Sequence, residues 1–165
     1  GQIGLAVAKR AQVSGMRVIY SNRNQRPDDA ATGASFRAFD ALLAEADCIV
    51  LLVPLTAETR GMFRDEQFAK MKPTATLVNV ARGAVVDTEA LLRALEQKKI
   101  AGAALDVTDP EPLPPDHPLV GRDDVVITPH IGSATYETRA RMAMLAAENL
   151  LAFIDGTPLP TQVVP

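Results

Sequence analysis

Short apolar runs alternate with helical patterns along almost the whole chain. The apolar runs are rich in Val, Ile, Leu and Ala, and they lie at 16–20, 48–53, 76–80, 101–107 and 125–127. The helical patterns lie between and after them, at 40–46, 65–71, 88–99 and 135–154, and Asp40 is expected to cap the first of these helices. Strands that alternate with helices predict an α/β fold with a parallel, doubly wound sheet. In the last helix a stripe at spacings of three and four predicts a core face, made by Tyr136, Ala140, Ala143, Ala147, Leu150 and Ile154.

The chain opens on two glycines that stand before a helical pattern. Gly1 and Gly4 have the spacing of the second and third glycines of G-x-G-x-x-G, the turn that meets a dinucleotide's pyrophosphate. A flexible leader or simple close packing of the helix would give the same spacing. A Rossmann-like sheet needs a central first strand before this turn, and none precedes Gly1. We therefore expect an incomplete domain that lacks its first strand and comes from a longer parent.

Composition narrows the possible partners. Of 165 residues 47% are hydrophobic, only 4% are aromatic and none is Trp, so the core must be aliphatic. The formal net charge is −3, and no basic run or aromatic platform indicates nucleic-acid binding. No apolar stretch has the length of a membrane span, and no signal-peptide pattern is present. Because the single cysteine, Cys48, lies in an apolar run, we expect it to be buried and the protein to be cytoplasmic.

The loop after the first apolar run bears on cofactor choice. A dinucleotide site that prefers NAD usually carries an acid here, about 20 residues past the glycines. This chain has Ser21, Asn22 and Arg23 instead. Without a carboxylate there is no repulsion against a 2′-phosphate, and a guanidinium can bind that phosphate through two hydrogen bonds. The loop therefore favours NADP over NAD, although Arg23 and Arg26 could equally be solvated loop charges.

Three polar residues follow later strand ends, which in a parallel sheet line the ligand crevice. Arg82 comes after 76–80, where it could bind a substrate carboxylate or form a surface salt bridge. Glu111 lies between two prolines, which limit the entropy lost in fixing it, but it could be an ordinary exposed acid. His130 follows 125–127 and suits proton transfer near neutral pH, although a loop histidine can simply satisfy backbone groups. His117 lies away from any strand end and is expected to be structural.

Three segments around these residues resemble signatures of the D-2-hydroxyacid dehydrogenase family. They are LVNVARG at 77–83, LDVTDPEPLP at 105–114 and TPHIGS at 128–133. Three such motifs in register are far more specific than any one of them. The similarity covers essentially the whole chain, but only the family's nucleotide-binding domain. Within the family, Ser21-Asn22-Arg23 and the VTD at 107–109 are most similar to glyoxylate/hydroxypyruvate reductases that use NADPH.

The resemblance implies a role for each matching residue. Arg82 would hold the substrate's carboxylate and keto oxygen, His130 would donate a proton to that oxygen, and Glu111 would hold the other ring nitrogen of His130. The pyrophosphate would meet Gly1, Gln2 and Ile3, and the adenosine ribose would meet Ser21, Asn22 and Arg23. The nicotinamide side would be lined by Val53, Pro54, Val80, Ala81, Asp106 and Gly132, with Thr59 and Ser133 beside them. No metal is implied.

The resemblance also sets expectations for the whole protein. Residues 1–165 would be the nucleotide-binding domain, with 155–165 as a C-terminal tail, and this fragment without a substrate domain would be inactive. The full-length parent, expected to be a homodimer, would reduce a small 2-keto acid such as glyoxylate or hydroxypyruvate to the D-2-hydroxy acid, with NADPH preferred and NADH possible. One alternative is a nucleotide-sensing binding module or corepressor with the same fold. Another is a sister enzyme that acts on phosphoglycerate, lactate or formate.

Overall fold

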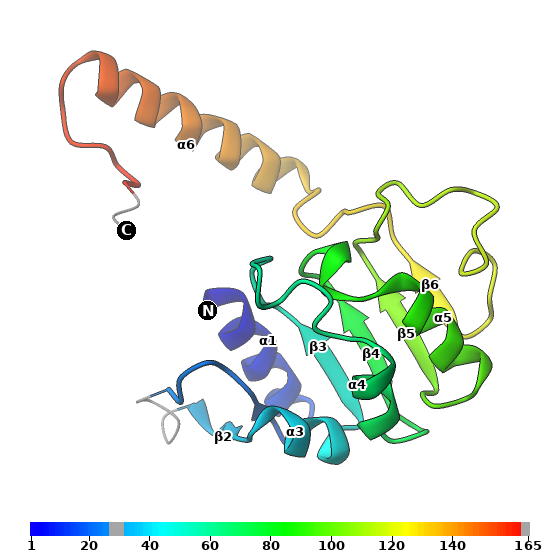
Figure 1. Cartoon of the computed structure of the whole chain (residues 1–165). Coiled ribbons are helices and arrows are strands. Elements are labelled where there is room, and N and C mark those ends of the chain that lie inside the picture. Colours follow the sequence, from blue (N-terminus) through cyan, green and yellow to red (C-terminus); the bar gives the residue numbers. More distant parts are fainter. Residues whose placement is uncertain (27–31, 163–165) are drawn as a thin grey trace. The chain divides into compact units, whose positions relative to one another are not determined.

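The computed structural model describes residues 1–26 and 32–162. It forms two compact units, Gly1–His130 and Ile131–Pro165, and each is described by itself (Figure 1). The first unit holds every strand of the described chain, and the second holds one long helix and the segment that follows it. Of the expected tail at 155–165, the last three residues lie outside the described residues.

A parallel sheet forms the centre of the first unit. Its strands are β3 (Cys48–Leu51), β4 (Thr76–Asn79), β5 (Gly102–Leu105) and β6 (Val125–Ile127), and they lie side by side in that order. All three pairings are parallel, so the four carboxyl ends lie at one edge of the sheet. A separate parallel pair is formed by β1 (Ile19–Tyr20) and β2 (Ser35–Phe36). The predicted parallel α/β class is confirmed. The strand β6 matches its apolar run, and the other predicted strands are shorter than theirs because pairing covers only part of each run.

Helices connect the strands in the way the alternating pattern predicts. The first unit contains α1 (Gln2–Val13), α3 (Phe39–Glu45), α4 (Asp65–Lys70) and α5 (Thr88–Glu96), and a short 3₁₀ turn, η1 (Gly83–Val85). The helix α4 lies between α3 and α5 and contacts both. In Figure 1, α4 and α5 lie in front of the sheet. Asp87 begins α5, because its carboxylate accepts a hydrogen bond from the Ala90 N–H at 2.9 Å.

The core lies between the sheet and these helices. Because side chains alternate across a strand, one face of the sheet carries Ile49, Leu77 and Ala103, all buried. They pack with buried helix and loop residues, among them Leu43, Phe63, Phe68, Val85, Leu91 and Leu95. On the other face Val50, Val78 and Ala104 are only half-buried, and Val126 is 63% exposed. The core is thus mainly aliphatic, as composition predicts, with Phe63 and Phe68 as aromatic members, and it is built mainly on the α4–α5 face.

Two expectations about single residues in this unit are wrong. Asp40 does not cap α3, because the N-cap position falls on Ala38; its carboxylate instead accepts a hydrogen bond from Lys70 Nζ at 3.0 Å. Cys48 is exposed rather than buried. It is the first residue of β3, which is an outer strand of the four-stranded sheet, so fewer neighbours cover it.

The expected core stripe of the last helix is also wrong for the described chain. The helix α6 (Tyr136–Ile154) forms with Thr135 as its N-cap, but it contains no buried residue. Tyr136, Leu150 and Ile154 are among its exposed large apolar side chains. Within the described part of Ile131–Pro165 no second helix or strand is present to cover this face, and a stripe becomes core only where another element packs on it.

Candidate active site

The loops that follow β3, β4, β5 and β6 carry most of the candidate residues. Pro54 and Thr59 follow β3, Arg82 follows β4, Asp106 follows β5 and His130 follows β6. Because these strands are parallel neighbours, their carboxyl ends bring the loops to one edge of the sheet. The candidate site is therefore assembled from four loops on a single scaffold.

His130 and Glu111 form the closest pair of candidate side chains. Nδ1 of His130 lies 2.6 Å from Oε1 of Glu111, and both side chains are about half exposed. The other carboxylate oxygen of Glu111 accepts a longer hydrogen bond, 3.4 Å, from the Thr108 N–H. The hydrogen bond to His130 holds the pKa of Glu111 below its ordinary value, helped by that N–H and by the charges of His130 and Arg82. Glu111 is thus an ionised, oriented partner of the imidazole, although it lies on the surface.

A buried asparagine shapes the turn that carries Arg82. Asn79, at the end of β4, is 1% exposed. Its side chain accepts a hydrogen bond from the Ala81 N–H at 3.1 Å and donates one to the Arg82 carbonyl at 3.0 Å. Arg82 Nη1 donates to the Ala81 carbonyl at 2.7 Å, and among the described residues Arg82 forms no ion pair. The alternative of a surface salt bridge is therefore absent there, and the exposed guanidinium keeps donors available for a ligand.

The backbone at His130 is in an unusual conformation. His130 has φ of 54°, in the left-handed region that side chains other than glycine rarely adopt. Its N–H donates to the Thr128 carbonyl at 3.0 Å, which closes a tight turn around Pro129. The Thr128 hydroxyl donates to Oδ1 of Asp106 at 2.5 Å. Asp106 and His130, which the sequence placed in different motifs, are therefore connected through Thr128.

The loop after β3 is closed by its own threonines. The Thr59 hydroxyl donates to the Pro54 carbonyl at 2.6 Å, and Thr59 Oγ1 accepts from the Thr56 N–H at 2.8 Å. Glu58 accepts a hydrogen bond from the Thr56 hydroxyl at 2.6 Å. That bond lowers the pKa of Glu58, and the positive charge of Arg23 lowers it further. The charge of Arg23, in the loop after β1 that also carries Ser21 and Asn22, therefore acts on the Glu58 carboxylate in the loop after β3.

The glycine-rich start of the chain lies at the beginning of α1. Gly1 is the N-cap of this 12-residue helix, and Gln2 and Ile3, its first residues, are exposed. The first N–H groups of a helix lack partners within it and can bind an anion. Within the described chain, a Cβ on Gly4 would meet only Leu52 Cδ1, at 3.8 Å. Gly132 and Ser133 belong to the second unit and are not placed relative to the other candidates.

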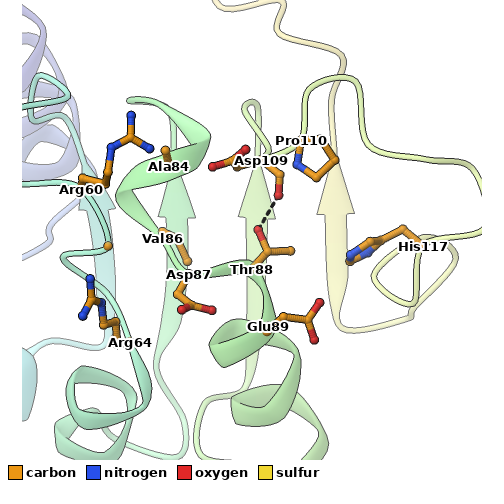
Figure 2. Close-up of a pocket in the computed structure, with 11 residues that line it drawn as sticks. Arg60, Arg64, Ala84, Val86, Asp87, Thr88, Glu89, Asp109, Pro110 and His117 are labelled. Atoms are coloured by element: carbon orange, nitrogen blue, oxygen red, sulfur yellow. Dashed lines mark hydrogen bonds between the residues drawn. The ribbon is translucent and has the colours of Figure 1, made fainter.

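A separate open cavity lies beside the α5 N-terminus. It has a volume of about 490 Å³ and contains none of Arg82, Glu111 and His130. Figure 2 shows Arg60 and Arg64 on one side of it and Glu89 and His117 on the other, with the Thr88 hydroxyl bound to the Asp109 carbonyl at 2.8 Å. His117 Nδ1 accepts a hydrogen bond from the Leu119 N–H at 3.2 Å, which is a structural contact. The cavity lining mixes both signs of charge and indicates no single ligand.

Three contributors to the site went unassigned in the sequence. Asn79 holds the Arg82 turn, Thr128 connects Asp106 to the His130 turn, and the backbone of Thr108 binds Glu111. An asparagine at the end of an apolar strand was the one available signal, since a buried amide needs partners. Among residues 1–26 and 32–162 no cluster of three or more His, Cys, Asp or Glu is arranged to hold a metal. No helix in those ranges is long and apolar enough to cross a membrane.

Comparison with known proteins assigns the fold. Residues 1–132 match the family model of the D-isomer specific 2-hydroxyacid dehydrogenase, NAD binding domain. A glyoxylate reductase of Thermococcus onnurineus is 52% identical over 164 residues, which cover 99% of this chain and 49% of the relative. The chain spans about half the length of the curated relatives it matches.

Two solved structures are similar to the chain and differ in bound cofactor. One is an NADPH-dependent glyoxylate/hydroxypyruvate reductase of Sinorhizobium meliloti in complex with NADP and malonate, with a TM-score of 0.92 and 33% identity, covering 99% of this chain and 50% of that one. The other is a D-lactate dehydrogenase of Lactobacillus jensenii with NAD⁺, with a TM-score of 0.91 and 33% identity, covering 100% and 53%. The fold is therefore that of a Rossmann-like dinucleotide-binding domain, and both cofactors occur among its relatives.

Proposed function

The chain belongs to the D-isomer specific 2-hydroxyacid dehydrogenase family as its NAD-binding domain, and from this we propose that the full-length protein reduces a small 2-keto acid to the D-2-hydroxy acid. Glyoxylate and hydroxypyruvate are the proposed substrates, because relatives about half identical to this chain are named for them. The observation that carries the proposal is the 2.6 Å contact between His130 and Glu111 in a site that also includes Arg82.

The chemistry divides between the cofactor and this chain's side chains. A bound nicotinamide would supply the hydride to the keto carbon. His130 would give its Nε2 proton to the keto oxygen, so that the C=O becomes a C–OH and the imidazole is left neutral. Glu111 would accept the Nδ1–H hydrogen bond, which stabilises the doubly protonated ring before the transfer and keeps the remaining proton on Nδ1 after it. Arg82 would bind the carboxylate and orient the carbonyl.

The residues that would hold a dinucleotide fit that group. Gly1, Gln2 and Ile3 offer free N–H groups at the α1 N-terminus for a pyrophosphate. The loops after β1 and β3 would flank the adenosine. Arg23 in the first loop is close enough to Glu58 in the second for its charge to lower the pKa of that carboxylate. Val53, Pro54, Val80, Ala81 and Asp106 follow neighbouring strand ends, where the nicotinamide would lie. Gly132 and Ser133 are proposed to complete that side.

Replacing Glu111 tests the paired arrangement through the reduction rate. In Glu111→Gln the carboxylate beside Nδ1 of His130 becomes a neutral amide, so the imidazole loses its charged hydrogen-bond partner. We expect kcat/KM for keto-acid reduction to fall about tenfold or more, which corresponds to the strength of a hydrogen bond to a charged group. Asp116→Asn, in the same exposed loop, is the matched control and should keep kcat/KM within about twofold of wild type. A comparable fall in both variants would contradict the assignment.

We propose that NADPH is preferred, because Ser21-Asn22-Arg23 offers no carboxylate against a 2′-phosphate. In Asn22→Asp a new carboxylate would repel the phosphate and accept hydrogen bonds from the ribose of NADH. We expect the ratio of kcat/KM for NADPH to that for NADH to fall about tenfold or more, given the strength of hydrogen bonds to charged groups. Asn24→Asp adds the same charge two positions further on and should leave the ratio nearly unchanged. A ratio that is unaltered in Asn22→Asp would contradict this reading of the loop.

The remaining proposals concern the whole protein. Residues 1–165 would serve as the nucleotide-binding domain, with 155–165 as its tail and the substrate domain elsewhere in the protein; the match to about half of each relative supports this. A homodimer and a cytoplasmic location belong to the same proposal.

The direct test is steady-state oxidation of NADPH and of NADH by the full-length protein, with glyoxylate and then hydroxypyruvate. Turnover with NADPH favoured supports the substrate class and the reading of the loop together. Turnover with NADH favoured keeps the reductase and removes the NADPH preference. Cofactor binding without turnover on any 2-keto acid would contradict the enzyme and favour a nucleotide-sensing module.

A further inference from the structure

The structure assigns Thr128 as a positioning residue for His130, acting through a hydrogen bond to Asp106. This inference rests on the proposed function, because it takes His130 as the proton donor. Thr128 touches neither substrate nor cofactor in this account. Its hydroxyl sets the turn from which the imidazole reaches both Glu111 and the keto oxygen.

The hydrogen bonds of Thr128 form a continuous path across the sheet edge. The Thr128 N–H donates to the Leu105 carbonyl at 2.9 Å, and its hydroxyl donates to Oδ1 of Asp106 at 2.5 Å. Asp106 is in turn held by its own N–H, which donates to the Asn79 carbonyl at 3.0 Å. Asn79 also shapes the Arg82 turn through its buried side chain. The turns that carry Arg82 and His130 are thus both hydrogen-bonded to residues at the ends of the same two strands, β4 and β5.

The conformation of His130 explains why such a support is needed. A non-glycine residue with φ of 54° is strained and persists only where its surroundings over-determine it. Two features on its N-terminal side restrain the His130 backbone. One is Pro129, whose ring fixes its own φ, and the other is the His130 N–H bond to the Thr128 carbonyl at 3.0 Å. Both restraints hold His130 in place only if the backbone of Thr128 is itself held in place. The Thr128 N–H bond to the Leu105 carbonyl fixes its backbone, and the hydroxyl bond to Asp106 is the side-chain contact that holds Thr128 beyond the end of the β6 ladder.

The Asp106 carboxylate has a second function in this arrangement. The sequence places Asp106 beside the nicotinamide by resemblance, whereas the structure shows one of its oxygens bound to Thr128. Through that oxygen the Asp106 carboxylate would orient the His130 turn. Losing the Thr128 hydroxyl should therefore displace the imidazole more than it weakens cofactor binding.

The test compares three variants of the full-length protein. Thr128→Val removes the hydroxyl and keeps the β-branched shape, so we expect kcat to fall about 10- to 100-fold, as for a small misplacement of a catalytic group. KM for the keto acid and Kd for NADPH should stay within about twofold, because that loss is in positioning and not in ligand contacts. Thr128→Ser restores the hydroxyl and should recover most of the rate. Thr76→Val, in β4, removes a threonine hydroxyl that makes no side-chain hydrogen bond with the described residues, and it should leave kcat unchanged.

A second readout separates this inference from the proposed function. The ring signals of His130 in an NMR spectrum, assigned by their loss in His130→Gln, should shift in Thr128→Val and return in Thr128→Ser, while those of His117 stay in place. A full-length protein that turns over no 2-keto acid would defeat the proposed function and leave this spectral test intact. Unshifted His130 signals, or a Thr128→Val protein with the kcat of wild type, would overturn the positioning role. So would a rate that Thr128→Ser fails to restore.

Discussion

His130→Gln in the full-length protein is expected to lower kcat for keto-acid reduction about 10²- to 10⁴-fold, the usual contribution of a positioned acid–base group. Glutamine retains an amide that can reach Glu111, but it cannot give up a proton at neutral pH. Because His130 acts in the chemical step, Kd for NADPH should change little. The measurements are steady-state reduction of glyoxylate and a fluorescence titration with NADPH.

The other histidine of the chain provides the matched control. His117 accepts a hydrogen bond from the Leu119 N–H, which a glutamine side-chain oxygen can also accept. We expect His117→Gln to keep kcat within about twofold of wild type, since surface substitutions away from special features are nearly neutral. Equal losses in the two variants, or a His130→Gln enzyme that retains full turnover, would contradict the assignment of the proton donor.

Gly83→Ala is expected to have the largest effect on stability. A Cβ at Gly83 would lie 1.9 Å from the Thr108 carbonyl oxygen and 2.1 Å from its carbon, a distance that real atoms do not reach. The backbone of one segment must therefore move, and we expect a loss of about 3 kcal/mol or more, at or above the upper range for overpacking. The substitution should also lower kcat, because Gly83 adjoins Arg82 and the displaced Thr108 N–H binds Glu111. Thermal unfolding and steady-state kinetics of the full-length protein measure both effects.

Gly121→Ala is the control for this substitution. It also replaces glycine by alanine, but the new Cβ would meet no atom within 4 Å, and only the backbone φ of 77° disfavours alanine there. We expect a smaller loss, about 1–2 kcal/mol, from that left-handed conformation alone. A Gly83→Ala protein with the Tm of wild type would show that the two loops are not packed as the structure has them.

The sequence predicts the sheet well because its physical signal is local. Short β-branched runs such as 125–127 favour a strand of the parallel sheet in an α/β chain. The same reasoning wrongly predicts that Cys48 is buried. Burial depends on where a strand lies within the sheet, and the sequence of the strand does not indicate that position. The reasoning fails for the α6 stripe as well, since periodicity reports which face is apolar and not what covers it.

In the candidate site, too, the sequence predicts the residues that local motifs mark, but not the contacts that depend on the folded sheet. Arg82, Glu111 and His130 each follow a recognisable strand end, and the structure places Nδ1 of His130 2.6 Å from Glu111. Their catalytic roles stay predictions. The contacts of Asn79 and Thr128 could not be derived, because each joins segments that only the folded sheet brings together. The close approach of Gly83 to Thr108 is of the same kind, because the two residues are 25 positions apart in the sequence.

Following the transferred hydride tests the proposed reduction most directly. The full-length protein would be given hydroxypyruvate and NADPH that carries deuterium at the transferred position of the nicotinamide ring, and the product would be analysed by NMR and chiral chromatography. We predict D-glycerate with deuterium on C2, because hydride from the cofactor and a proton from His130 add across the keto group. L-glycerate, or glycerate without deuterium on C2, would contradict the account.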